Sequence, residues 1–384
     1  MEPSKQKSLR QILAGKGLPE PDLPFLFLIL ILVCFGLVML FSASYAVAMY
    51  RRNDPYAYLR PQLLYALMGL AAMWVASRVD YHIYHKLAWP LFGISLVLLT
   101  VVLFMPEYNG CKRWIVIPGV GTLQPSEIAK FSVILLFSHI ISLNHDRMKT
   151  FRVGVLPFGL ILGVVAVLML LEPHLSGTLL IMGIGAVLMF VGGTGLKWFG
   201  LAGAGAVSAV VGAVIFLPDL VPYAANRLES WLDPFADPLG KGHQTIQSLY
   251  AIGAGGAAGL GLGNSRQKYL YVPEPQNDFI FSILCEELGF LGAMVVLGLF
   301  LALLLRGLLI ATHAADKFGA LLCVGFVVQV VMQAVLNVAV VTNTIPNTGI
   351  SLPFFSSGGT SLMMLLGEMG IVLSVSRYGN QNKI

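Results

Sequence analysis

The chain has 384 residues, of which 57% are hydrophobic and 11% are charged, with a net charge of +5 and a mean hydropathy of +0.80. Soluble domains are about 45–50% apolar and about 25% charged, so this composition excludes a soluble enzyme, a disordered chain and a fibrous protein. A transmembrane β-barrel is also excluded, because its strands would give alternating segments of about ten residues rather than long apolar runs. The sequence therefore predicts an all-α polytopic membrane protein.

The apolar runs predict ten transmembrane helices, since a helix needs about 20 apolar residues to cross a bilayer. In chain order they cover residues 24–49, 62–77, 87–105, 127–143, 155–171, 175–192, 196–217, 279–305, 318–341 and 353–376. We expect them to form one membrane domain, 24–377, between an N-terminal tail, 1–23, and a C-terminal tail, 378–384. One large loop, 218–278, joins the seventh and eighth helices.

Lysine and arginine are distributed unevenly between the two sides of this topology. The tails and loops on the side of both termini contain 14 of them, against 5 in the short loops on the other side. Because cytoplasmic loops are enriched in these residues, we expect both termini in the cytoplasm and the loop 218–278 outside the cell. Within that loop, residues 243–252 carry apolar side chains at helical spacing and predict an ordered helix.

Charged residues inside apolar segments are costly and often functional, and two of them open the fourth predicted helix. Glu127 complements the positive end of the helix dipole, whereas Lys130 opposes it. The two side chains are three residues apart and can pair. Structural pairing alone and the binding of an anion by Lys130 are equally compatible with the sequence.

Two further polar positions end the fifth predicted helix. Glu172 precedes a proline, which favours an ordinary helix end at the membrane interface over a functional role. His174 is better interpreted as an interfacial histidine than as a ligand.

Carboxylates also cluster around the start of the eighth predicted helix. Asp278 follows Glu274 by four residues, and Asn277 or Asp278 could cap the helix. Two carboxylates at a water–lipid boundary also suit a general base, because burial and neighbouring charges shift their pKa values. At least one of Glu286 and Glu287, two turns deeper, must face protein rather than lipid.

The segment 342–361 is rich in hydroxyl residues, glycine and proline, which predicts irregular backbone that lines a polar cavity. Glycines beside serines, in this case Gly358 and Gly359 with Ser356 and Ser361, expose N–H groups that can cradle phosphate. The alternative is an ordinary turn followed by a close helix contact.

An outward-facing transferase would need a substrate that carries its own leaving group, such as a lipid-linked pyrophosphate sugar. One cation for the pyrophosphate and one carboxylate base would be its minimum equipment.

Taken together, these segments resemble the SEDS family (shape, elongation, division and sporulation). The resemblance rests, in order, on Arg113-Trp114, Gln124-Pro-Ser-Glu-Ile-Ala-Lys130, Glu172-Pro173, Pro273-Glu274, Asp278-Phe-Ile-Phe281, Glu286-Glu287-Leu-Gly289, Asn343-Thr-Ile-Pro346 and Ser356-Ser-Gly-Gly-Thr-Ser361. It extends over residues 24–377. The stretch 233–248 is more similar to the division and sporulation branch, FtsW and SpoVE, than to the elongation branch, RodA.

The resemblance implies a peptidoglycan glycosyltransferase of the bacterial plasma membrane. Such an enzyme polymerises lipid II, the undecaprenyl-pyrophosphoryl disaccharide-pentapeptide, at the outer face, here for cell division or spore cortex synthesis. The implied partners are a class B penicillin-binding protein, which acts as transpeptidase, and other division or sporulation membrane proteins. No nucleic-acid partner is expected. No cofactor is certain and no metal ligand is assigned, although a divalent cation, Mg²⁺ or Mn²⁺, is compatible with the family.

The family's catalytic aspartate falls on Asp278. Substrate binding is expected at Arg113, Trp114, Glu127, Lys130, Glu172, Glu274, Ser356, Gly358, Gly359 and Ser361. The family usually has His-Thr directly before the aspartate, where this chain has Gln276-Asn277.

Two other functional classes are alternatives to the polymerase. A lipid-linked precursor flippase or transporter would place polar residues near the midplane, whereas those of this chain gather at the outer helix ends. A non-catalytic scaffold for the penicillin-binding protein would need neither Asp278 nor Lys130.

Overall fold

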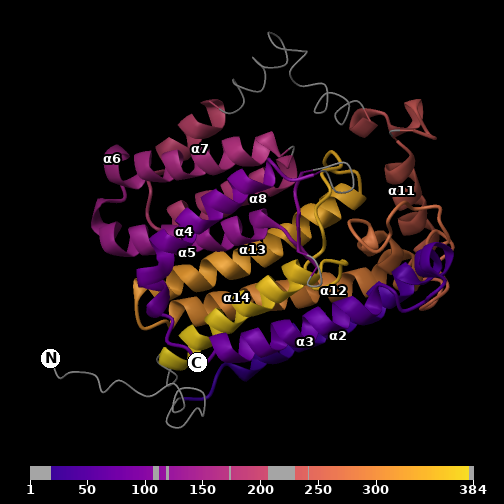
Figure 1. Ribbon diagram of the computed structural model, residues 1–384, viewed down its shortest axis with the longest axis horizontal. Helices are drawn as coiled ribbons and strands as arrows, with labels where there is room; N and C mark the ends of the chain where they lie inside the picture. Colours follow the sequence, from indigo (N-terminus) through magenta and orange to yellow (C-terminus); the bar gives the residue numbers. More distant parts are fainter. Residues whose placement is uncertain are drawn as a thin grey trace.

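The computed structural model describes residues 19–106, 112–117, 121–172, 174–205, 230–240 and 242–379. Within these ranges the chain forms a bundle of long helices that run side by side (Figure 1). The long helices are α2 (Leu23–Arg52), α3 (Leu59–Ala76), α4 (Ile83–Val102), α5 (Pro125–Asn144), α7 (Leu156–Leu171), α8 (Leu175–Val191), α12 (Ile280–Thr312), α13 (Lys317–Val341) and α14 (Gly359–Tyr378). The short ones are η1 (His145–Arg147), α6 (Phe151–Gly154), η3 (Pro234–Ala236) and α11 (His243–Gly255).

The all-α polytopic class is confirmed. Eight helical segments in the described ranges are long and apolar enough to cross a membrane, and α8 is a shorter apolar helix. Residues 196–205 are helical and begin the seventh predicted span, whose remainder, 206–217, lies outside the described residues. The count of ten therefore stays a prediction. The last predicted span, 353–376, begins too early, because α14 starts at Gly359.

A small β-hairpin was not predicted. Strand β1 (Ile115–Ile117) pairs antiparallel with β2 (Gly121–Leu123), with Ile115 opposite Leu123. Three residues are too few for a periodicity signal, although β-branched residues are typical of strands. The hairpin directly precedes α5 in the chain, and Arg113 and Trp114 directly precede its first strand.

The two ends of the described chain meet at one end of the bundle. Asp22 forms a salt bridge with Arg306 at 2.7 Å, and its backbone N–H donates to the hydroxyl of Ser376. Arg377 donates to the carbonyl of Pro19. Residues 19–22 and the last turn of α14 therefore lie together, opposite the end that carries α11 (Figure 1).

The predicted helix in the large loop is confirmed as α11, which packs against the membrane helices. A Cβ atom on Gly255 would lie 1.9 Å from the carbonyl oxygen of Cys285 in α12, so the two backbones touch. The hydroxyl of Ser248 donates to the carbonyl of Val341 at the end of α13. The loop is thus ordered by contact with the bundle.

The residues after α11 repair a kink in α12. At Gly289 the backbone leaves helical geometry, with φ of 68° and ψ of −168°. The carbonyls of Glu286 and Glu287 accept from the N–H groups of Leu260 and Gly261, and the carbonyls of Gly256 and Ala257 accept from Phe290 and Leu291. The loop 256–261 therefore supplies the hydrogen bonds that the kink removes from the helix.

Side chains hold the next part of the same loop. Glu287 is fully buried and pairs with Lys268 at 2.9 Å, and it also accepts from the hydroxyl of Ser42. Glu286, also fully buried, accepts from the hydroxyl of Ser265 and the N–H of Arg266. Both glutamates face protein, as at least one was expected to do, and they fix the loop that leads to Asp278.

Gly289→Ala should destabilise the protein. At this φ and ψ a non-glycine residue costs about 1–3 kcal/mol, and the new Cβ would lie 2.3 Å from the backbone nitrogen of Gly259. The matched control is Gly298→Ala in the same helix, where a Cβ meets no atom within 4 Å. The apparent unfolding temperature in detergent should fall for the first variant and hold or rise for the second. Equal unfolding temperatures for Gly289→Ala and Gly298→Ala would contradict the conclusion that the kink requires glycine at position 289.

Candidate active site

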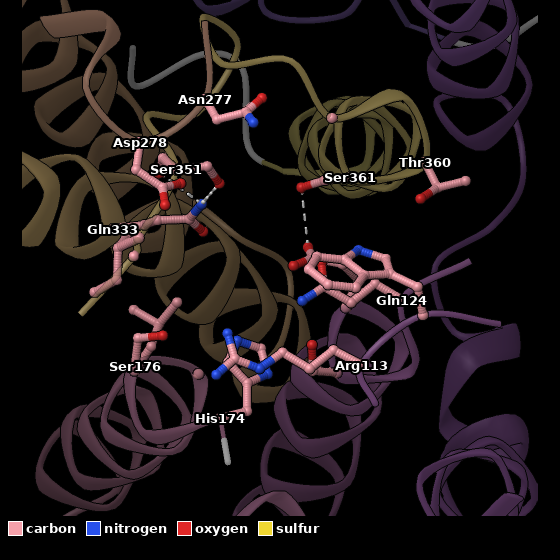
Figure 2. A pocket seen from close by; sticks show the side chains of 18 of the residues that line it. Arg113, Gln124, His174, Ser176, Asn277, Asp278, Gln333, Ser351, Thr360 and Ser361 are labelled. Carbon is pink, nitrogen blue, oxygen red and sulfur yellow. Dashed lines mark hydrogen bonds between the residues drawn. The ribbon is translucent and has the colours of Figure 1, made fainter. Parts of the chain in front are cut away.

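A cavity of about 440 Å³ opens at the end of the bundle where α14 begins. Its wall includes eight of the residues that the sequence singles out: Arg113, Trp114, Glu127, Lys130, Asp278, Gly358, Gly359 and Ser361. Figure 2 shows side chains from several helices and loops directed toward this space. Segments that are far apart in the sequence therefore meet at one polar cavity.

Lys130 is 4% exposed and is held by neighbours on two helices. Its Nζ lies 2.8 Å from Oε1 of Glu127 and 3.3 Å from Oε1 of Gln333. The second oxygen of Glu127 accepts from the hydroxyl of Ser361. The predicted ion pair is confirmed, and because both partners line the cavity, the binding of an anion stays a prediction beside it.

Gln333 connects the lysine to the irregular segment that follows α13. Its Nε2 donates to the carbonyl and the hydroxyl of Ser351, at 3.0 and 3.2 Å (Figure 2). Residues 342–358 contain no helix or strand, and part of this segment lines the cavity. The irregular backbone predicted before the last span is thus present, and it extends through residues 353–358, which were also assigned to that span. The sequence analysis overlooked Gln333, although a buried polar residue in an apolar helix is itself a signal.

Asp278 is positioned through its backbone. One turn after Gln333, the amide of Asn337 donates to the carbonyl of Asp278 at 2.7 Å and to that of Ile350 at 2.6 Å. Phe279 occupies the N-cap position of α12, so neither Asn277 nor Asp278 is its capping residue. A Cβ on Gly349, whose φ is 68°, would lie 3.1 Å from the Asp278 carboxylate. Glycine at this position therefore lets the backbone approach the carboxylate closely.

Three predicted binding residues, Ser356, Glu274 and Glu172, lie outside the cavity wall. The hydroxyl of Ser356 donates to the carbonyl of Asn277 and accepts from the N–H of Leu352, so it clamps backbone. Glu274 pairs with Arg51 of α2 at 2.5 Å and accepts from the amide of Gln276. Glu274 is close to Asp278 in the sequence, and Ser356 is close to Gly358 and Gly359, but neither side chain lines the cavity.

Glu172 is fully buried behind the cavity, and its carboxylate has no hydrogen-bond partner among the residues that the structure describes. Burial raises the pKa of Glu172 to about 8, against an opposite effect of the Arg113 charge. The side chain is therefore protonated near neutral pH. Nε of Arg113 donates to the carbonyl of Glu172 at 3.4 Å, which holds the arginine against the end of α7.

His174 lies in the cavity wall rather than at a plain interface, which corrects its interpretation from sequence. It is 7% exposed. Burial, followed by the charges of Arg113 and Lys130, lowers the pKa of His174 to about 3, so the imidazole is neutral. Within the described ranges, no group of three or more His, Cys, Asp or Glu side chains is arranged to hold a metal ion.

Comparison with known proteins assigns the chain to a family. The sequence model of the family that contains FtsW, RodA and SpoVE, described as "Cell cycle protein", matches residues 23–381. The chain belongs to this family. FtsW, RodA and SpoVE relatives match nearly the whole chain.

Two sequence relatives and two solved structures illustrate the similarity. Stage V sporulation protein E of Bacillus subtilis is 41% identical over 94% of this chain and 98% of its own length. A probable peptidoglycan glycosyltransferase FtsW of Geobacter sp. (strain M18) is 39% identical over 92% of this chain and 96% of its own. A chain in a structure on the coordination of polymerization and crosslinking by a peptidoglycan synthase complex is 32% identical, with a TM-score of 0.77, over 94% of this chain and 99% of that one. The rod shape determining protein RodA of Thermus thermophilus is 27% identical, with a TM-score of 0.68, over 94% and 98% of the two chains.

Proposed function

We propose that this member of the FtsW, RodA and SpoVE family is a peptidoglycan glycosyltransferase that polymerises lipid II. The observation that carries the proposal is one cavity that joins a carboxylate, Asp278, to two cations, Arg113 and Lys130. This is the minimum equipment for transferring a sugar from a pyrophosphate. The FtsW relative, a probable peptidoglycan glycosyltransferase, supports the same reaction class.

In the proposed reaction, Asp278 takes the proton from the 4-hydroxyl of the acceptor N-acetylglucosamine. The freed oxygen attacks the anomeric carbon of the donor N-acetylmuramic acid. The bond from that carbon to the lipid pyrophosphate breaks, and the pyrophosphate leaves with the bonding electrons. Lys130 and Arg113 stabilise the negative charge that grows on it.

We propose that a class B penicillin-binding protein is the partner. Support comes from the similarity to a chain of a peptidoglycan synthase complex that combines polymerization and crosslinking. Proteins of division or sporulation are further proposed partners, in line with the FtsW and SpoVE relatives.

We further propose that residues 24–377 form one membrane domain of a plasma-membrane protein with both termini in the cytoplasm and the loop 218–278 outside. The uneven distribution of lysine and arginine supports this orientation. The cavity would then face the outer side, where lipid-linked substrates carry their own leaving group.

This orientation can be tested by labelling single cysteines in an otherwise cysteine-free protein. Leu239 is 91% exposed in the large loop, and Lys149 is exposed between η1 and α6. In intact cells a membrane-impermeant maleimide should label Leu239→Cys and not Lys149→Cys. Inverted membrane vesicles should give the opposite pattern, and labelling of Leu239→Cys only in those vesicles would reject the orientation.

Asp278→Asn tests the base. General-base catalysis is worth about 10²–10⁴-fold, so polymerisation of purified lipid II by the complex with the transpeptidase should fall by at least that factor. Asn keeps the size of the side chain. Glu274→Gln is the matched control, since Glu274 pairs with Arg51 outside the cavity, and its effect should be mild. Near wild-type rates in Asp278→Asn would reject the assignment, and a transporter or scaffold would become the better explanation.

Lys130→Met tests the anion site. Because this change leaves the buried Glu127 unpaired, which costs about 3–5 kcal/mol, the double variant Lys130→Met/Glu127→Gln should restore stability. Both variants should lose polymerisation, because the cation itself is needed. Unfolding temperature and polymerisation rate are measured in parallel. Restored polymerisation in the double variant would reduce the pair to a structural salt bridge.

A further inference from the structure

The backbone of His174 is held by several hydrogen bonds, whereas Nδ1 of its side chain has no hydrogen-bond partner among the described residues. Its N–H donates to the carbonyl of Met169, and its carbonyl accepts from the N–H and the hydroxyl of Thr178. These bonds end α7 and begin α8. The buried Nδ1 of the ring, by contrast, has no hydrogen-bond partner in the described part of the chain. A buried imidazole nitrogen without a partner is costly, so the empty cavity leaves this ring incompletely satisfied.

Gly177 makes room for this ring at the cavity wall. A Cβ at Gly177 would lie 2.8 Å from Cε1 and 3.0 Å from Nδ1 of His174. The imidazole therefore lies directly over the first turn of α8, and both residues line the cavity. Figure 2 shows the His174 side chain directed into the cavity, in the region of Arg113.

The fixed charges of the described cavity wall balance one another, so they leave the charge of a bound pyrophosphate uncompensated. Its described wall contains two cations, Arg113 and Lys130, and two carboxylates, Glu127 and Asp278, which together carry no net charge. Glu172, behind the wall, is protonated near neutral pH because burial raises its pKa. A pyrophosphate diester brings two negative charges. His174 is a wall residue that can supply positive charge by taking up a proton.

We propose that His174 takes up a proton when the pyrophosphate of a lipid-linked donor enters the cavity, and that the imidazolium donates a hydrogen bond to the pyrophosphate. This inference rests on the proposed function. In the empty cavity, burial and then the charges of Arg113 and Lys130 oppose protonation of the ring. A bound pyrophosphate offsets the two charges and places negative charge beside the buried ring, which favours the charged imidazole. When the bond to the sugar breaks, the pyrophosphate gains a third charge, takes the proton from His174 and leaves singly protonated.

The test is the pH dependence of lipid II polymerisation by the complex with the transpeptidase, between about pH 6 and pH 8. The charged imidazole is the binding form, so binding is strongest at low pH and is lost as pH rises. The KM of the wild type should therefore rise with pH, by up to about tenfold per pH unit. His174→Gln keeps a polar side chain that cannot be protonated. Its KM at the low end should be about 10–100 times higher, and the His174-dependent rise with pH should vanish.

The matched control is His145→Gln, which removes an exposed histidine of η1 at the far end of α5 and should leave KM and its pH dependence unchanged. Gly177→Ala is a second test, because it keeps the imidazole but its new methyl group would displace the ring. It should raise KM and weaken the rise with pH. A wild-type pH dependence in both His174→Gln and Gly177→Ala would overturn the proposal.

A binding measurement separates this inference from the proposed function. The probe is a farnesyl-pyrophosphoryl sugar, a diester whose phosphates do not titrate in this range. The wild type should bind it more weakly as pH rises, and His174→Gln should show no such trend. If the wild type bound the probe in this way without polymerising lipid II, His174 would stand and the proposed function would fail. If the wild type polymerised lipid II and both proteins bound the probe with the same pH dependence, the proposed function would stand and the role of His174 would fail.

Discussion

A backbone that leaves helical geometry inside a membrane protein must find all its hydrogen-bond partners within the protein, and the cavity depends on how this chain meets that constraint. The chain leaves helical geometry at Gly289 and again over residues 342–358. The loop 256–261 supplies backbone partners at the first place, and Asn337 and Gln333 supply side-chain partners at the second. Asp278 lies just before α12, which contains the first break, and its carbonyl shares the Asn337 amide with Ile350 of the second. Its position is therefore set by bonds whose loss would expose unpaired polar groups to an apolar interior.

The buried charges obey a related constraint. Lys130 opposes the dipole of its own helix, and a single buried cation would be unstable. Glu127 and Gln333 compensate it from α5 and α13, and Ser361 ties the pair to α14. The same contacts that make the lysine tolerable fix its distance from the other helices. Because the charged residues of the described wall balance one another, the protein can stay folded when the cavity is empty. The two cations among them can still bind an anion.

The sequence predicted the parts of this arrangement that depend on average polarity or on an unusual charge. Apolar runs locate the helices, and the misplaced charge of Lys130 locates the ion pair. The start of α14 was missed because Leu352–Phe355 is apolar and buried but not helical. Hydropathy predicts which residues are buried, but it does not predict which neighbours a side chain contacts. For that reason Glu172, Glu274 and Ser356 were expected at the binding site, whereas Gln333 and His174 were not.

The two residues before Asp278 illustrate why a departure from the family pattern can leave the site intact. Where the family usually has His-Thr, this chain has Gln276-Asn277. The carbonyl of Gln276 accepts from the N–H of Ser357, and that of Asn277 accepts from the hydroxyl of Ser356. Any residue offers the same carbonyls, so these clamps do not depend on side-chain identity. The side-chain amides of both residues donate to Glu274, which pairs with Arg51. The substitution therefore ties the segment to α2 through Glu274, while the backbone that presents Asp278 is held as it would be with other side chains.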